Sequence, residues 1–380
     1  MNTTLQNPAK LVFGTNSFQT FISDLIGSGH KRLFILTVPE VLALLQEGIN
    51  RLKSSGCQVE TDTTIRKEPS FTDYKQLLAK TNKFTPDCVA GIGGGSVLDT
   101  AKLIATTAGS DVKVEDFLKG TQKFARTKKL ICLPTTSGTG SEVSPNAIFI
   151  APETGDKIGV IDPQLVPDAT YIDPLLTLSV PPSVTAATGL DALTHCIEAY
   201  VNNFSTPVVD LWALEGIKLI GQNLKKAFDN GNNTEAREKM ALGSMYGGMC
   251  LGPVNTAAVH ALAYPLGSTF KIAHGVSNAM LLPFVLEYNL ECAVEKYANI
   301  AQAIGINSNA DDKTIAKEGI NKLKEMIAYF KIPGRLSDLG IEKKDIVGMA
   351  HSAMKVQRLL KNNVREIKLQ DAIDIYTKAL

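Results

Sequence analysis

The 380-residue sequence has almost no excess of charge and no long apolar run. Its 39 Lys and Arg residues face 38 Asp and Glu residues, which gives no electrostatic reason to expect a nucleic acid or an anionic membrane as partner. No segment reaches the roughly 18 uninterrupted apolar residues of a membrane-spanning helix. The N-terminus also lacks the basic start and apolar stretch of a signal peptide. We therefore expect a cytoplasmic protein that binds small molecules.

Cysteine is scarce, and the cysteines are not paired in any motif. The six residues stand singly and form no C-x-x-C, so the pattern argues against a disulfide framework and against a thiolate metal site. We expect reduced thiols that act as small buried hydrophobes. The six are Cys57, Cys88, Cys132, Cys196, Cys250 and Cys292.

Histidine is also rare, but three of the five histidines fall in two short segments of low charge. Asp191 and His195 are spaced i and i+4, which places a carboxylate and an imidazole on one helical face. His260 and His274 follow in the second segment. Each group alone is more commonly a helix cap or a satisfied core residue, whereas the four together predict one buried divalent metal site. The other two histidines are His30 and His351, to which we assign no role.

Apolar runs alternate with helical patterns in the first half of the chain. Residues 31–38 and 88–93 are short β-branched or apolar runs, and each is followed by an amphipathic stretch, at 41–56 and 96–108. This alternation predicts parallel β-α-β units. Residues 130–136 add another buried strand. Prolines divide residues 157–174 into two short extended pieces.

Helical patterns dominate after about Pro174, and convincing strands disappear. We predict an α/β dinucleotide-binding domain with a parallel sheet at 1–178, followed by an all-helical metal-binding domain at 179–380. Helices are expected at 181–201, 206–228, 234–250, 292–305, 313–330, 343–354 and 369–380.

Two loops rich in glycine or hydroxyl groups follow predicted strands. The first, Gly91–Ser96, joins a strand to a helix, where free N–H groups favour a phosphate. It is not G-x-G-x-x-G and has no P-loop lysine, so a plain tight turn remains an alternative. The second, Pro134–Glu142, offers hydroxyls to phosphate, ribose or nicotinamide. Both loops should lie at the carboxyl ends of their strands, where ligands of open α/β sheets bind.

The chain resembles the iron-containing (group III) alcohol dehydrogenases from about residue 8 to the end. The resemblance implies the dehydroquinate synthase-like architecture of that family, with the active site in a cleft between the two domains. It implies a metal, Fe(II) first and Zn(II) next, together with NAD or NADP. The matching segments are 91–102, 133–144, 166–174, 188–201, 259–283 and 362–380.

Site residues follow from the same resemblance. The metal ligands would be Asp191, His195, His260 and His274. The phosphate contacts would fall on Gly94, Gly95 and Ser96. The residues expected near the nicotinamide or ribose are Asp99, Thr135, Thr136 and Thr139, and Lys157 matches a lysine that approaches the cofactor in relatives.

Two positions depart from the family pattern. At the end of the strand predicted at 31–38, many relatives carry an Asp that bonds the adenosine ribose. This chain has Val38 there, so the preference for NAD or NADP stays open. Many relatives also have a second histidine four residues after the third ligand, where this chain has Tyr264. Because a tyrosine has a pKa near 10, it is a poor proton acceptor at neutral pH. Tyr264 is a candidate for bonding the substrate or cofactor, or for shaping the cleft.

The resemblance implies a dehydrogenase that acts on a small primary alcohol or diol and its aldehyde. A dehydroquinate synthase-like lyase shares the scaffold, but it needs a basic pocket, and few Lys or Arg lie near the ligands in the sequence. A non-catalytic cofactor-binding protein would have lost ligands or a broken glycine loop. The apolar run at 9–14 could supply an edge strand to a homodimer or a larger homo-oligomer. Candidates for apolar lining, each with an alternative place in the core, are Phe149, Val254 and Phe270.

Overall fold

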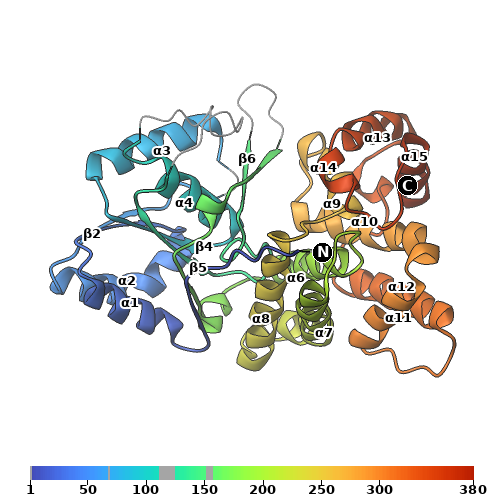
Figure 1. Ribbon diagram of the computed structural model, residues 1–380, viewed down its shortest axis with the longest axis horizontal. Helices are drawn as coiled ribbons and strands as arrows, with labels where there is room; N and C mark the ends of the chain where they lie inside the picture. The colour runs from blue at the N-terminus through green and yellow to red at the C-terminus, as the bar shows by residue number, and fades with distance from the viewer. Residues whose placement is uncertain (1, 67–68, 111–124, 151–156) are drawn as a thin grey trace. The chain divides into compact units, whose positions relative to one another are not determined.

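The computed structural model describes residues 2–66, 69–110, 125–150 and 157–380, and the chain divides into two compact units (Figure 1). The α/β unit comprises residues 6–136 and 140–179. The helical unit comprises 180–380 together with two short pieces, 1–5 and 137–139. The sequence places both pieces in the N-terminal domain, and 137–139 is the middle of the second loop.

A six-stranded parallel sheet forms the centre of the α/β unit, in the order β1-β8-β5-β4-β2-β3. Strand β2 is buried on both faces, which explains its continuous apolar run. Leu33 and Ile35 pack with the core under α1 and α2, whereas Phe34 and Leu36 pack with the core under α3 and α4. The strands are β1 (Lys10–Phe13), β2 (Arg32–Leu36), β3 (Gln58–Asp62), β4 (Cys88–Gly93), β5 (Lys129–Pro134) and β8 (Ala169–Ile172).

Helices cover both faces of this sheet, as the β-α-β pattern predicts. They are α1 (Ser17–Ser28), α2 (Pro39–Ser54), α3 (Phe71–Phe84) and α4 (Gly95–Thr107). A separate antiparallel pair consists of β6 (Asn146–Ile150) and β7 (Lys157–Ile161). The two extended pieces predicted at 157–174 therefore belong to different sheets, since β8 is in the six-stranded sheet.

The helical unit contains all seven helices that the sequence predicts. They are α6 (Pro182–Tyr200), α7 (Pro207–Asp229), α8 (Thr234–Leu251), α11 (Val294–Ala303), α12 (Asp312–Tyr329), α13 (Ile346–Met354) and α15 (Leu369–Ala379). Three more are α9 (Ala258–Ser268), α10 (His274–Asn289) and the short α14 (Gln357–Leu360). The predicted fold class is confirmed. Within the described part of the chain, no helix is long and apolar enough to span a membrane.

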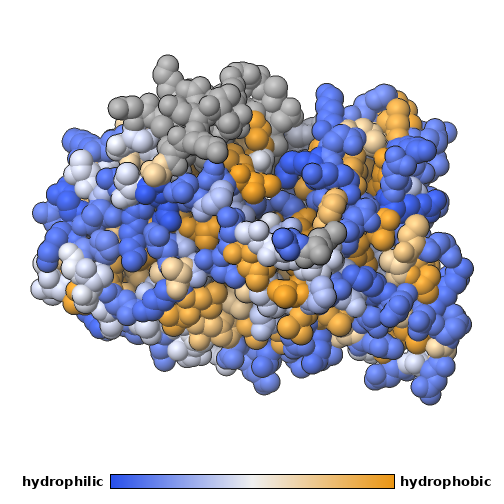
Figure 2. All heavy atoms as spheres, in the orientation of Figure 1, coloured by the Kyte–Doolittle hydropathy of each residue, from blue (hydrophilic) through white to orange (hydrophobic). Residues whose placement is uncertain are grey.

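Hydrophobic residues reach the surface of the helical unit (Figure 2). Near the start of α7, Phe204, Val208 and Leu211 are 43%, 41% and 69% exposed. Thr3 donates or accepts a hydrogen bond with Thr206 at 3.1 Å, so the N-terminal segment lies beside this region. Exposed apolar side chains that gather in this way are typical of protein–protein contacts.

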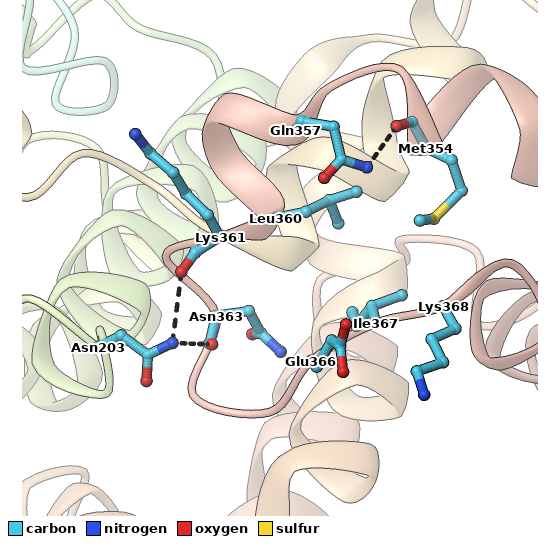
Figure 3. Close-up of a pocket in the computed structure, with 9 residues that line it drawn as sticks. All are labelled: Asn203, Met354, Gln357, Leu360, Lys361, Asn363, Glu366, Ile367 and Lys368. Atoms are coloured by element: carbon cyan, nitrogen blue, oxygen red, sulfur yellow. Dashed lines mark hydrogen bonds between the residues drawn. The ribbon is translucent and has the colours of Figure 1, made fainter.

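An open cavity of about 380 Å³ lies near the C-terminus of the same unit (Figure 3). It is lined by polar and charged side chains from α14 and the segment that follows, including Gln357, Lys361 and Lys368. None of the predicted metal ligands lines this cavity.

Candidate metal centre and nucleotide loop

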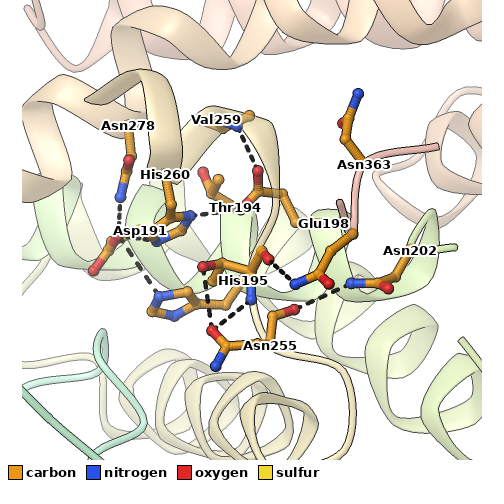
Figure 4. Close-up of polar contacts among 12 residues, drawn as sticks. Asp191, Thr194, His195, Glu198, Asn202, Asn255, Val259, His260, Asn278 and Asn363 are labelled. Carbon is orange, nitrogen blue, oxygen red and sulfur yellow. Dashed lines mark hydrogen bonds and ion pairs between the residues drawn. The ribbon is translucent and has the colours of Figure 1, made fainter. Parts of the chain in front are cut away.

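Three helices bring the four predicted metal ligands together. Asp191 and His195 lie on α6, His260 lies in the first turn of α9, and His274 is the first residue of α10. The Oδ1 atom of Asp191 is 4.0 Å from Nε2 of His195. The same oxygen is 3.6 Å and 3.7 Å from Nε2 of His260 and His274. Figure 4 shows Asp191, His195 and His260 pointing toward one another.

The burial of these donors fits a metal ion. Asp191, His195 and His260 are almost completely buried, while the side chain of His274 is 32% exposed. The buried Nε2 atom of His260 has no hydrogen-bond partner among the described residues. A buried polar atom without a partner is costly, and a metal ion would satisfy it. One carboxylate and three imidazoles suit Fe(II), Zn(II), Co(II) or Ni(II).

The charges of the cluster set the protonation of its candidate ligands. Burial alone would raise the pKa of Asp191, but the imidazoles of His274, His195 and His260 hold it below its usual range. Burial lowers the pKa of His195, against the opposing effect of the Asp191 charge. A metal ligand must be deprotonated. Asp191 and His195 are therefore in the binding form at neutral pH.

Glu198 is a site residue that the sequence did not predict. Its Oε2 lies 2.6 Å from Nδ1 of His260, and its Oε1 accepts a hydrogen bond from the Val259 amide at 2.6 Å (Figure 4). Burial lowers the pKa of His260, but the negative charges of Glu198 and Asp191 raise it to about 9. With its Nδ1 occupied by Glu198, His260 presents Nε2 to Asp191. A carboxylate behind a ligating histidine fixes the tautomer and the ring orientation.

Asn278 is a second residue that the sequence did not predict. Its Nδ2 donates to Oδ1 of Asp191 at 2.6 Å and lies 3.2 Å from Nε2 of His274. The amide therefore orients the carboxylate from the side of α10. Helical spacing is the signal that could have indicated both residues, since Glu198 follows His195 by three positions and Asn278 follows His274 by four.

In the α/β unit, the first loop and residues 134–136 of the second lie side by side at the carboxyl ends of β4 and β5. The amide of Thr135 donates to the carbonyl of Gly93 at 2.9 Å. Gly94 precedes α4, and its neighbour Thr136 would be 3.5 Å from a Cβ at position 94. The predicted residues Gly94, Gly95, Ser96, Thr135 and Thr136 are thus at one edge of the sheet, beside the N-terminus of a 13-residue helix.

Neither the backbone conformation nor the packing at position 94 requires a glycine. Its φ of −76° is open to any residue, and a Cβ would meet only ordinary van der Waals contacts. Gly93 differs, because a Cβ there would lie 2.7 Å from the side chain of Val97. The protein therefore has room for a methyl group at Gly94 beside Thr136, and the same room would allow the close approach of a ligand.

Asp99 has structural bonds of its own. It is buried in α4, where Oδ1 accepts from the Ser141 hydroxyl at 2.5 Å and Oδ2 accepts from the Ile148 amide at 2.9 Å. Asp99 thus ties α4 to the segment that carries the second loop, and its contact with the cofactor stays a prediction. Thr139 groups with the helical unit. The side chain of Lys157, at the start of β7, lies outside the described residues.

Tyr264 and the candidate lining residues have defined places in the structure. Tyr264 is half-buried on α9, and its hydroxyl accepts a hydrogen bond from Nη2 of Arg358 at 3.0 Å. Phe149 is fully buried and packs edge-on against Phe71 and Tyr74, so it belongs to the core of the α/β unit. Val254 is buried in the core of the helical unit, and Phe270 packs against that core.

A parallel α/β unit with a glycine loop at its strand ends and a helical unit with a carboxylate–imidazole cluster indicate the class of metal-dependent, nucleotide-linked enzymes. Comparison with known proteins agrees. Residues 8–174 match the family model of iron-containing alcohol dehydrogenases, and residues 185–380 match that of the C-terminal part of the Fe-containing alcohol dehydrogenase family. The chain belongs to the iron-containing alcohol dehydrogenase family and is an oxidoreductase.

Individual relatives match along their whole length. Long-chain-alcohol dehydrogenase 1 of Geobacillus thermodenitrificans is 36% identical, over 98% of this chain and 96% of the relative. A crystal structure of a 1,3-propanediol oxidoreductase superimposes with a TM-score of 0.94 and 31% identity, covering 100% of both chains. The sulfoacetaldehyde reductase of Bifidobacterium kashiwanohense, in complex with NAD+, has a TM-score of 0.89 and 25% identity, covering 100% of this chain and 99% of that one.

Proposed function

We propose that this alcohol dehydrogenase interconverts a small primary alcohol or diol and its aldehyde, with a divalent metal at Asp191, His195, His260 and His274. The observation that carries the proposal is the convergence of three imidazole nitrogens within 4.0 Å of Asp191 Oδ1. One of them, the buried Nε2 of His260, has no hydrogen-bond partner among the described residues. Relatives named 1,3-propanediol dehydrogenase and NAD-dependent methanol dehydrogenase support this substrate class, whereas the relative from Geobacillus thermodenitrificans is named for long-chain alcohols. Iron is the first choice of metal because of the family, and zinc is the next.

The residues of the ligand cluster would have separate roles in the reaction. When bound, the metal polarises the substrate oxygen and the nicotinamide exchanges hydride with the adjacent carbon. Asp191 supplies the single negative charge among the donors. Burial of Asp191, His195 and His260 excludes water from the cluster, and the partial exposure of His274 marks the side on which solvent reaches it.

The proton path differs from one that uses a histidine at position 264. The Tyr264 hydroxyl accepts a hydrogen bond from Arg358, and its own hydrogen has no acceptor among the described residues. Tyr264 can therefore donate a hydrogen bond to a ligand, which supports a role in holding substrate or cofactor. It offers no group that readily accepts a proton at neutral pH.

An assay of purified protein tests this function. Protein reconstituted anaerobically with Fe(II) should reduce NAD or NADP with primary alcohols from ethanol to hexanol and with propanediol. A chelator should remove the activity, and added Fe(II) should restore it. Separate titrations with NAD and NADP decide the preference that Val38 leaves open. If no alcohol supports nicotinamide reduction by metal-loaded protein, the proposal is wrong.

Cofactor binding at the glycine loop predicts a contrast between two neighbouring substitutions. Gly94→Ala should weaken NADH binding about tenfold or more, because the new methyl group occupies the space of the pyrophosphate, with the melting temperature unchanged. Gly93→Ala should lower the melting temperature instead, because its methyl group overlaps Val97. Fluorescence titration with NADH and thermal denaturation measure the two effects. Unaltered NADH affinity in Gly94→Ala would place the pyrophosphate elsewhere.

We also propose that the protein is a cytoplasmic homodimer. Strand β1 is an edge of the sheet, which leaves one side of its backbone free to pair. The exposed Phe204, Val208 and Leu211 provide apolar surface for a second copy. Light scattering should give about twice the 40.8 kDa mass of the chain. A monomer mass across the micromolar range would contradict the dimer.

A further inference from the structure

The half-buried Arg358 has no anionic partner in the described part of the chain. It lies on α14, which packs against α9, and its one hydrogen bond there is the donation to the hydroxyl of Tyr264. No carboxylate pairs with it among the residues that the structure describes. A partly desolvated guanidinium gains much from an anion, because it offers several N–H donors in a planar fork.

Arg358 also lies in a segment without acidic residues. Residues 346–365 contain no Asp or Glu, and they include Lys355, Arg358, Lys361 and Arg365. None of these four forms an ion pair with another described residue. The segment is far from the metal ligands in the sequence, and the fold brings Arg358 to α9. For this reason, counting basic residues near the ligands in the sequence missed Arg358.

Tyr264, the partner of Arg358, lies on α9 together with the candidate ligand His260. Tyr264 follows His260 by four residues, so the two side chains share one helical face, one turn apart. The Tyr264 hydroxyl hydrogen and the remaining N–H groups of Arg358 are available as donors. One helical turn is about 5.4 Å along the axis, so an anion bound beside Tyr264 would be within reach of a short substrate whose other end is at the ligand cluster.

We propose that Arg358, positioned by Tyr264, binds a carboxylate at the far end of the substrate. The substrate class is then a short aldehyde that carries an acid group, together with the corresponding hydroxy acid. This inference rests on the proposed function, because it uses the same donor cluster for the reacting oxygen. A carboxylate of the substrate and a phosphate of the cofactor would both present an anionic oxygen to Arg358.

A pair of aldehydes of equal chain length separates these sources. Succinic semialdehyde carries the carboxylate, and butanal does not. The holoenzyme and its Arg358→Gln, Arg358→Lys and Tyr264→Phe variants are assayed with both aldehydes, and NADH affinity is measured by fluorescence. The matched control is Lys361→Gln. It removes a positive charge three residues after Arg358, at a side chain that lines the open cavity (Figure 3).

We expect wild-type protein to prefer succinic semialdehyde. Arg358→Gln should reduce the ratio of kcat/KM for succinic semialdehyde over butanal about 10- to 100-fold, mainly through KM. Arg358→Lys should recover part of the ratio, Tyr264→Phe should reduce it by less than Arg358→Gln, and Lys361→Gln should keep it. NADH affinity should stay the same in all variants.

Two results would overturn the proposal. An unchanged ratio in Arg358→Gln means that Arg358 binds no substrate carboxylate. Weaker NADH binding, with equal losses for both aldehydes, assigns the anion to the cofactor instead. Failure of the proposed function is distinguishable from both, because metal-loaded wild-type protein would then turn over neither aldehyde.

Discussion

Replacement of Asp191 by alanine is expected to reduce metal content and alcohol-dependent nicotinamide reduction to background. Asp191 is the only carboxylate among the four predicted ligands, and its Oδ1 lies within 4.0 Å of Nε2 of all three histidines. Without Asp191 the site loses one of its four ligands and the only ligand that carries a negative charge, so a divalent cation would be held less tightly. Metal analysis of the purified variant and steady-state assays measure the loss.

Folding must be separated from metal binding in this experiment. The α/β unit has its own core and does not include Asp191, so NADH binding and the circular dichroism spectrum should remain close to those of wild type. His351→Ala is the matched control, because His351 is exposed and has no predicted role. Wild-type turnover by an Asp191→Ala protein that is verified to be metal-free would refute the ligand assignment.

Patterns of apolar residues were sufficient to predict the fold class. The run at 31–38 became β2 because both faces of the strand are buried, and each amphipathic stretch after a strand became a covering helix. Helices α9 and α10 were not predicted from the same patterns. Each contains an internal proline, Pro265 or Pro283, and has few polar residues, so neither shows the one-sided pattern of a surface helix.

The four candidate ligands could be proposed from spacing and resemblance, whereas helical spacing alone could put Glu198 and Asn278 on the same faces as the ligands without showing what they contact. Glu198 lies on a buried face of α6, and its role becomes visible only when the fold brings His260 beside it. Arg358 is 94 residues away from Tyr264 in the sequence. Such contacts depend on the packing of α6, α9, α10 and α14, which local periodicity does not specify.

Glu198 provides the second large expected effect. Glu198→Gln should weaken metal binding about 10- to 100-fold, as is typical when the partner of a ligating histidine is changed. The amide keeps the volume of the side chain, but it is neutral and cannot hold both the Val259 amide and the His260 Nδ1–H as the carboxylate does. Competition with a chromophoric chelator measures the metal affinity directly, without turnover. Glu215→Gln, an exposed change on α7, is the control.

The position of Glu198 separates a role in orienting His260 from a general role in stability. If Glu198 acts on His260, metal affinity should fall in Glu198→Gln while NADH affinity and the melting temperature of the metal-free protein stay close to wild type. Glu198→Ala should weaken metal binding further, because it also leaves the Val259 amide without its acceptor at the start of α9. Equal metal affinity in wild type and Glu198→Gln would mean that the packing of α9 alone orients His260, and that the 2.6 Å contact adds nothing to metal binding.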